Sequence, residues 1–159
     1  MIGGPNETWY EAKRECKRNG GYLVEIESQE EQDVLLAWIW EEVERVEGVE
    51  VLPPHQNPLF WIGLTDIFHD GTWVWDNLGK PLDFSNWASG EPNNYKGVQH
   101  CVAMKVWGAE DDSADDGKWD DISCETMKSG NFSLDSTIGY ICEAAGETLS
   151  NTQFSFIIS

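Results

Sequence analysis

Four widely spaced cysteines constrain the fold of this chain more than any other feature. They are Cys16, Cys101, Cys124 and Cys142, and no two of them have the CxxC spacing of a zinc or redox site. An even number of such cysteines is typical of proteins that fold in an oxidising compartment. Four cysteines can pair in three ways, and the sequence pattern leaves all three open. We therefore expect a disulfide-linked fold in a secreted or extracellular protein.

The length and the charge of the chain limit its size and its partners. Its 159 residues fit one domain that can bury a core without help. Ten basic against 29 acidic residues give a formal charge of −19, which repels nucleic acid and anionic membranes and favours cations. No apolar run is long enough to span a bilayer. We therefore expect no nucleic-acid partner and no membrane insertion.

Two sequons, at Asn6 and Asn131, also indicate an extracellular glycoprotein, although such tripeptides are frequent by chance. Residues 1–4 lack the charged and apolar regions of a secretory signal peptide. If the protein is secreted, the chain would correspond to a mature or incomplete form of it.

Two capping boxes predict two helices in the first third of the chain. Thr8 and Glu11 have the spacing of a box that opens a helix over about residues 9–18. Ser28 and Glu31 open a longer helix that reaches about Val46. The apolar side of that second helix is expected to consist of Val34, Leu35, Trp38, Ile39 and Val43.

The rest of the chain predicts short strands separated by loops. Apolar or alternating runs predict strands over residues 60–64, 72–75, 101–107 and 139–143. Residues 48–58 contain two prolines in a row and are expected to form a loop. Residues 76–100 are rich in Gly, Asn and Pro, and a structureless segment of that length is usually a functional loop.

Oxygen-bearing side chains gather in the sequence between Glu91 and Cys124, on segments that we expect to be irregular. Carboxylate and amide oxygens are the ligands that a hard cation such as calcium selects. Each motif alone has a simpler interpretation, because Glu-Pro-Asn is commonly a turn and an Asp pair is commonly solvated. Together and in this order they favour a calcium site. The candidate ligands are Glu91, Asn93, Gln99, Asp120 and Asp121.

The ordered motifs resemble those of the C-type lectin domain, in its short form with four cysteines. The matching features are the two helices, residues 61–64, Glu91-Pro92-Asn93, Trp119-Asp120-Asp121 and the cysteines, and they cover roughly residues 8–143. The resemblance implies an α+β fold, in which two helices flank small antiparallel sheets and a long calcium-binding loop region. The domain would span residues 1–145, with a weakly ordered tail over 146–159.

The resemblance also implies how the cysteines pair. Cys16 would pair with Cys142, and Cys101 with Cys124. Only a few residues precede the first helix, where the family has a strand that pairs with the C-terminal strand.

In members of this family that bind sugars, one calcium ion contacts two neighbouring sugar hydroxyls. The resemblance implies that all five candidate ligands hold the metal, and that all of them except Asp121 also hydrogen-bond the sugar. Tyr95 could stack on the apolar face of a galactose-type sugar. Pro92 would follow a cis peptide bond, which aims Glu91 and Asn93 at the same ion.

Two candidate ligands depart from the mannose-type pattern of the family. That pattern has Glu where this chain has Gln99, and Asn where it has Asp120. The number of carboxylates is unchanged, but the donor and the acceptor at the second hydroxyl are exchanged. Galactose-type sites break the same symmetry at the first pair. The resemblance therefore leaves mannose-type sugars, with fucose and GlcNAc, and galactose-type sugars both open.

Further cation sites are suggested less strongly by the sequence. A second calcium position found in some family members would use Asp66, Asp70, Asn94, Gln99 and His100. The acidic run over residues 110–117 does not have the ligand spacing of an EF-hand loop. Two interpretations remain open for it, which are loose calcium binding and an added negative potential beside the site.

Three classes of function compete. The first is a calcium-dependent carbohydrate-binding domain, and the second is a calcium-independent protein-binding domain of the same fold. The third, a glycosidase, lacks an acid in an apolar pocket, and the three histidines have no nucleophile beside them, so we expect no enzyme. A single shallow sugar site binds weakly, so oligomers or repeated domains would supply avidity. The family resemblance also suggests a role in innate immunity.

Overall fold

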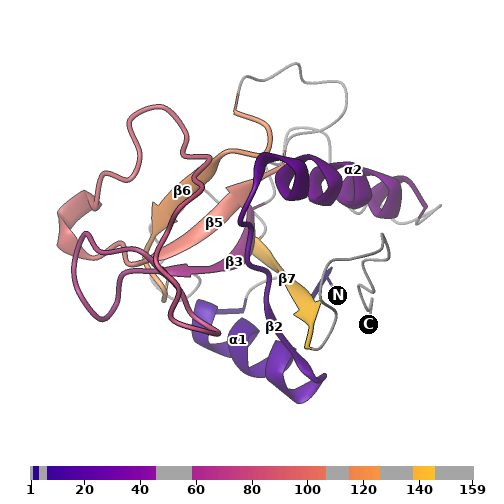
Figure 1. Ribbon diagram of the computed structural model, residues 1–159, viewed down its shortest axis with the longest axis horizontal. Coiled ribbons are helices and arrows are strands. Elements are labelled where there is room, and N and C mark those ends of the chain that lie inside the picture. The colour runs from indigo at the N-terminus through magenta and orange to yellow at the C-terminus, as the bar shows by residue number, and fades with distance from the viewer. Residues whose placement is uncertain (1, 4–6, 46–58, 107–114, 126–137, 146–159) are drawn as a thin grey trace.

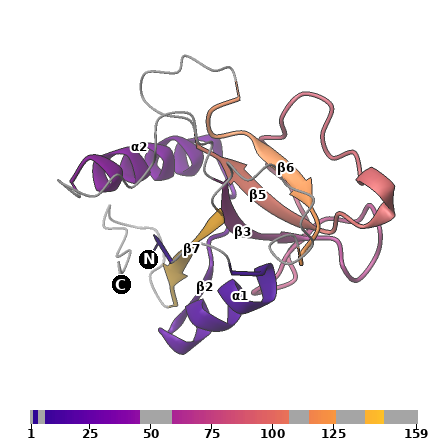
Figure 2. The same ribbon diagram turned by 180° about the vertical axis from the view of Figure 1, so that it is seen from behind.

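The computed structural model describes residues 2–3, 7–45, 59–106, 115–125 and 138–145. Two helices lie on opposite sides of one sheet in this part of the chain (Figures 1 and 2). They are α1 (Trp9–Arg18) and α2 (Gln29–Arg45). The strands are β1 (Ile2–Gly3), β2 (Gly21–Leu23), β3 (Leu59–Thr65), β4 (Val74–Trp75), β5 (Cys101–Lys105), β6 (Trp119–Ile122) and β7 (Ile138–Ala144). The fold class is therefore α+β, as the sequence analysis expected.

The sheet joins both ends of the described chain. Its main order is β1-β7-β3-β5-β6, with β2 also paired to β7 and β4 to β3. Strands β3 and β7 run parallel, and the other pairs are antiparallel. Ile2 faces Ile141 across the first pair, so the few residues before α1 are enough to form the end-to-end pairing.

The core is divided by the period of two along the central strands. On β3, Leu59 and Trp61 pack with α1, whereas Phe60, Ile62 and Leu64 pack with α2. Successive side chains of a strand point to opposite faces, and here both faces are covered. This explains why every residue of β3 is buried. The predicted strand at residues 60–64 is confirmed.

Both helices begin where the capping residues predict. Thr8 accepts a hydrogen bond from the Glu11 backbone N–H (3.2 Å), and Glu11 accepts one from the Thr8 N–H (2.9 Å). No described helix is long and apolar enough to cross a membrane.

The buried side of α2 differs from the predicted one. Gln32, Leu35 and Ile39 are almost fully buried, but Val34 is 37% exposed. The three buried residues are three and four positions apart, so they lie along one face of the helix, and Val34 lies outside that face. Gln32 is tolerated inside because its side chain bonds the Trp119 indole N–H at 2.8 Å.

The two disulfides pair as the family resemblance implies. Cys16 on α1 is bonded to Cys142 on β7, and Cys101 on β5 is bonded to Cys124 just after β6. The first closes a loop with a sequence separation of 126, which in the chain-entropy model stabilises the fold by roughly 4–5 kcal/mol. The second ties the ends of the two strands that carry the candidate site.

Three predicted elements differ from the structure, and one strand was not predicted. Asp120 and Asp121 were expected on an irregular segment, but they lie in β6, because β5 offers an unpaired edge that Trp119 can reach from the core. The strand expected at 72–75 begins only at Val74, and the one expected at 101–107 ends at Lys105. Strand β2 was not predicted, since its three residues are too short to show a pattern. Asn6 of the first sequon, the whole second sequon, residues 48–58 and the 146–159 tail lie outside the described residues.

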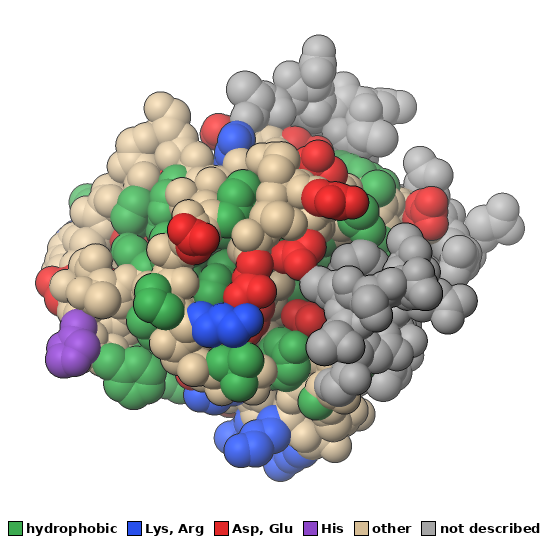
Figure 3. Space-filling model, in the orientation of Figure 1, with side chains coloured by type: hydrophobic (Ala, Val, Ile, Leu, Met, Phe, Trp, Pro, Cys, Tyr) green, Lys and Arg blue, Asp and Glu red, His purple; other side chains and the backbone are tan. Residues whose placement is uncertain are grey.

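Acidic side chains gather on the face that carries the segment between β2 and α2 (Figure 3). In that region the Glu25 backbone N–H donates to Glu143 at 3.5 Å, and Glu25 itself accepts from the Asn77 N–H at 3.0 Å. The pKa of Glu25 is raised to about 7. Burial is the largest cause, the Asn77 hydrogen bond opposes the rise, and the nearby charge of Glu143 contributes to it. The folded protein therefore favours the uncharged form of Glu25.

This raised pKa predicts a pH-dependent stability. Because the pKa of Glu25 is higher in the folded than in the unfolded chain, its contribution is complete below about pH 4.5 and is lost as the pH rises through about 7. We expect Glu25→Gln, measured by urea unfolding in chelator, to raise the free energy of unfolding at pH 8 by about 1 kcal/mol after solvent screening. At pH 4.5 it should change little. The exposed Asp83→Asn is the control, and an equal gain at both pH values would contradict the account.

Candidate functional site

Three carboxylates from two distant segments meet beside β6. One ligand oxygen from each of Glu91, Asp120 and Asp121 lies within 4.8 Å of the others. Pairing with β5 places Asp120 opposite Ala103 and Asp121 opposite Val102. Glu91 comes from the irregular segment before β5. Such a set of oxygens fits the ligand chemistry of calcium.

The position of Glu91 is fixed by contacts with the core. Trp119 is fully buried and packs edge-to-face on Trp87, with ring centroids 5.9 Å apart. The Ala88 N–H donates to the Trp119 carbonyl at 2.8 Å, and the Glu91 N–H donates to the Ala88 carbonyl at 3.1 Å. Trp119 therefore holds the loop of Glu91 against the strand of Asp120.

Asp121 is the anchor of the turn that follows Glu91. Its carboxylate is fully buried and accepts the backbone N–H of Asn93 at 2.9 Å and of Asn94 at 2.8 Å. The Asn93 N–H also donates to Glu91 at 3.1 Å. The Glu91–Pro92 peptide bond is cis, as the resemblance implies. Glu91, Asn93 and Asp121 are thus held in one small region.

The three carboxylates disfavour one another's charge. The pKa of Glu91 is raised to about 7. Burial is the largest cause, and a hydrogen bond to Asp121 and the charges of Asp120 and Asp121 contribute to the same rise. Burial also raises the pKa of Asp120, although the ion pair with Lys105 opposes this. A divalent cation would relieve this repulsion.

Gln99 and Tyr95 contact each other in the segment that follows Asn94. The Gln99 side-chain oxygen accepts from the Tyr95 backbone N–H, and the Gln99 N–H donates to the Asn94 side chain at 3.1 Å. Tyr95 is 63% exposed, and the Lys96 ammonium lies 5.1 Å from the centroid of its ring. The structure thus groups these two predicted residues with each other. Their predicted roles toward metal and sugar stay predictions.

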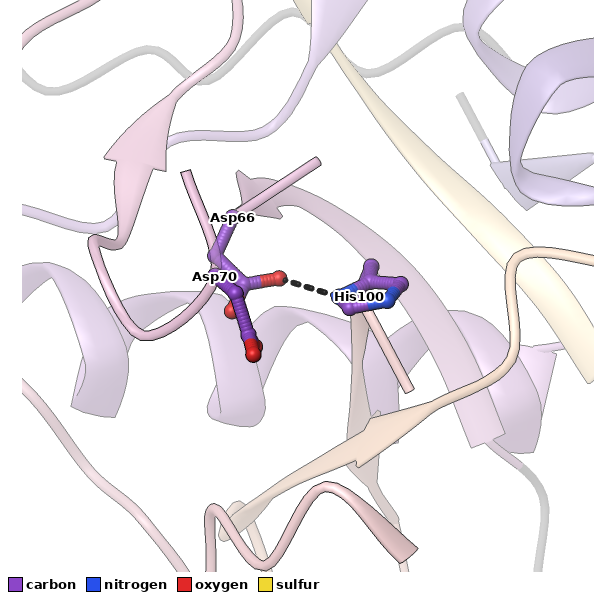
Figure 4. A group of neighbouring side chains, drawn as sticks. All are labelled: Asp66, Asp70 and His100. Carbon is purple, nitrogen blue, oxygen red and sulfur yellow. Dashed lines mark hydrogen bonds and ion pairs between the residues drawn. The ribbon is translucent and has the colours of Figure 1, made fainter. Parts of the chain in front are cut away.

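A second cluster contains Asp66, Asp70 and His100, whose ligand atoms also lie within 4.8 Å of one another (Figure 4). Asp66 is almost fully buried and contacts the His100 ring Nδ1 at 2.9 Å, while its other oxygen accepts the Gly71 N–H at 2.7 Å. These are three of the five residues of the predicted second calcium position. The contacts among them stabilise the loop without a metal.

Asn94 connects the two clusters, a role that the sequence did not reveal. Its backbone N–H donates to Asp121, and its side-chain amide donates to Asp70 at 2.8 Å. Its φ of 43° lies in the left-handed region, which Asn tolerates better than most residues. One residue thus couples the geometry of both clusters.

Lys105 was also missed by the sequence analysis. Its ammonium lies 3.1 Å from the Asp120 carboxylate, and both side chains are about four-fifths covered. The signal was present in the alternation of β5, where Lys105 follows Ala103 by two residues and so shares its face. The contact with Asp120 follows only from the pairing of β6 with β5, which the sequence did not reveal.

The sequence and fold were compared with known proteins. The model of the family described as "Lectin C-type domain" matches residues 5–130. A perlucin-like protein of Mytilus galloprovincialis is 30% identical over 136 residues, which cover 86% of this chain and 69% of that protein.

Solved structures give the same result for the fold. The carbohydrate-recognition domain of cow CD23, crystallised in the presence of a GlcNAc2Man3 oligosaccharide, is 32% identical with a TM-score of 0.56, covering 78% of this chain and 76% of that one. A calcium-independent type II antifreeze protein shares the fold at 24% identity with a TM-score of 0.56, covering 89% of this chain and 80% of that one. The family match, the disulfides and the fold agree, and the chain belongs to the C-type lectin domain family.

Proposed function

We propose that this chain is a calcium-dependent carbohydrate-binding domain. The observation that carries the proposal is the convergence of Glu91, Asp120 and Asp121 within 4.8 Å. Asn93 and Gln99 would complete the ligand set. The Asn93 backbone N–H donates to Asp121, and the Gln99 backbone N–H donates to the side chain of Asn94, the residue after Asn93. The cow CD23 domain, which was crystallised with an oligosaccharide present, supports carbohydrates as the ligand class through its 32% identity.

The residues divide the recognition of two adjacent sugar hydroxyls. Calcium, when bound, supplies open coordination positions for one lone pair of each hydroxyl. Glu91 accepts a hydrogen bond from the first hydroxyl, and the Asn93 amide donates one to it. Asp120 accepts from the second, and Gln99 donates to it. These bonds are charge-assisted where a carboxylate takes part, which makes them the stronger class.

The exchange of donor and acceptor at Gln99 and Asp120 leads to a proposal about selectivity. A mannose-type diol and a galactose-type diol present their hydroxyls with different local symmetry about the ring. With the second pair reversed, the site no longer has the two-fold arrangement of the mannose pattern. We therefore include galactose-type sugars among the ligands, with the exposed Tyr95 ring available for stacking.

A second candidate is a calcium-independent protein-binding domain. One observation favours it: Asp121 and Asp120 already have partners in the backbone of Asn94 and in Lys105. The antifreeze protein that shares this fold is itself described as calcium-independent. Neither candidate is an enzyme. We further propose an extracellular location and oligomers for avidity, and a role in innate immunity stays a prediction.

The proposal predicts that Glu91→Gln abolishes sugar binding. The variant keeps the size of the side chain but removes one of three metal-binding charges, so calcium affinity by calorimetry should fall by about tenfold or more. Retention on mannose and galactose resins should be lost with it. In chelator its thermal unfolding should match or exceed that of the wild type, because the charged form of Glu91 is disfavoured. Asp83→Asn serves as the control, and wild-type retention by Glu91→Gln would contradict the proposal.

Sugar binding should also fade in acid. The pKa of Glu91 is raised to about 7, so protons compete with calcium for this carboxylate below that pH. Calcium affinity should therefore fall as the pH drops from 8 to 5, and bound sugar should be released with the metal. Calcium titrations at pH 8, 6 and 5 measure this. Equal affinities across the range would count against a site built on Glu91.

The selectivity proposal is tested by restoring the mannose pattern. The double variant Gln99→Glu/Asp120→Asn keeps three carboxylates and reverses the second donor–acceptor pair. We expect the ratio of mannose to galactose affinity to rise relative to the wild type, as measured by competition on one resin at saturating calcium. A glycan array on which the wild type binds only mannose and fucose would overturn the proposal.

A further inference from the structure

The strongest unexplained group beside the site is the ammonium of Lys105. It lies at the end of β5 and contacts Asp120 at 3.1 Å, with only 19% of its side chain exposed. A lysine that merely adds solubility keeps its charged group in water. This one is instead held against a residue that takes part in the proposed site. The ion pair occupies one of its three N–H donors.

We propose that Lys105 is a specificity-determining residue of the sugar site, which selects glycans carrying an anionic substituent close to the coordinated hydroxyls. This rests on the proposed function. The shared chemistry is a sulfate ester or a carboxylate on the sugar, and it is recognised by an ammonium next to the diol.

The position of Lys105 supports this role. Asp120 has two oxygens, and Oδ2 faces Lys105, which leaves Oδ1 for the metal. A single carboxylate would therefore separate the ammonium from an ion bound about 2.4 Å from its ligand oxygens. The same carboxylate accepts the second sugar hydroxyl in the proposed arrangement. We therefore expect a group attached near that hydroxyl to come within reach of the remaining donors of Lys105.

The local charge points the same way. The three carboxylates carry −3, and calcium with Lys105 carries +3, so the occupied site is close to neutral. A neutral site can accept an anionic sugar, whereas the same site without Lys105 would carry a negative charge and repel it. A compact ammonium binds sulfate or carboxylate as a point charge. The overall charge of −19 opposes every anionic ligand equally in the wild type and in a variant of similar charge.

The experiment compares matched sugars with matched variants. The probes are galactose, galactose 6-sulfate and galacturonic acid, with mannose and mannose 6-sulfate as a second pair, so that the diol is the same within each set. The proteins are wild type, Lys105→Met, Lys105→Arg and the control Lys80→Met. Lys80 is also ion-paired, but with Glu27, so the control removes the same charge from another cluster. Calcium affinity is measured first, and each protein is then titrated with sugar at saturating calcium and low salt.

We expect the wild type to bind the sulfated or carboxylated sugar about fivefold more tightly than the neutral one. Lys105→Met should bring this ratio to about one and should raise calcium affinity, because it removes a cation next to the metal. Lys105→Arg and Lys80→Met should keep the anionic preference. The sulfate and carboxylate arms show which anion is preferred.

Two failures are distinguishable. Binding of neutral sugars with no preference for their anionic forms, or a preference that survives in Lys105→Met, would overturn the inference and leave the proposed function standing. Absence of calcium-dependent binding to every probe would overturn the proposed function itself, and the inference with it.

Discussion

Repulsion among Glu91, Asp120 and Asp121 is the interaction that the rest of the candidate site has to balance. Three carboxylates within 4.8 Å would move apart in a flexible chain. Here backbone N–H groups hold two of them in place, and the ion pair with Lys105 holds Asp120. Asp121 is fixed by two backbone N–H groups, and Glu91 follows a segment that is hydrogen-bonded to β6. The fold thus stores a local excess of negative charge at one place, which is what a divalent cation requires.

Contacts in the core and a disulfide hold the loop and the strand that carry these carboxylates. Trp119 connects the loop, strand β6 and helix α2, since it packs on Trp87 and bonds Gln32. The Cys101–Cys124 disulfide closes the ends of β5 and β6 just beyond the acidic pair. Asn94 then joins the acidic site to the cluster of Asp66 and His100. A change in one cluster is therefore expected to affect the other through a single residue.

Local signals in the sequence predicted much of the fold, and pairing between distant segments explains the rest. The capping box at Thr8 predicts where α1 begins because it depends on residues three apart. Asp120 lies in a strand because it pairs with β5, and the polar sequence around it does not indicate a strand. Lys105 was missed for the same reason, since its contact exists only in the register of β5 and β6. Val34 was predicted to be buried because it is apolar, but the buried side of the helix includes Gln32 and leaves Val34 partly exposed.

A crystal structure grown with calcium and a simple monosaccharide, galactose or mannose, tests the central claim most directly. The account predicts one ion about 2.3–2.6 Å from oxygens of Glu91, Asp120 and Asp121, with two adjacent sugar hydroxyls completing its coordination. An ion bound only between Asp66 and Asp70, or a sugar held elsewhere on the surface, would contradict it.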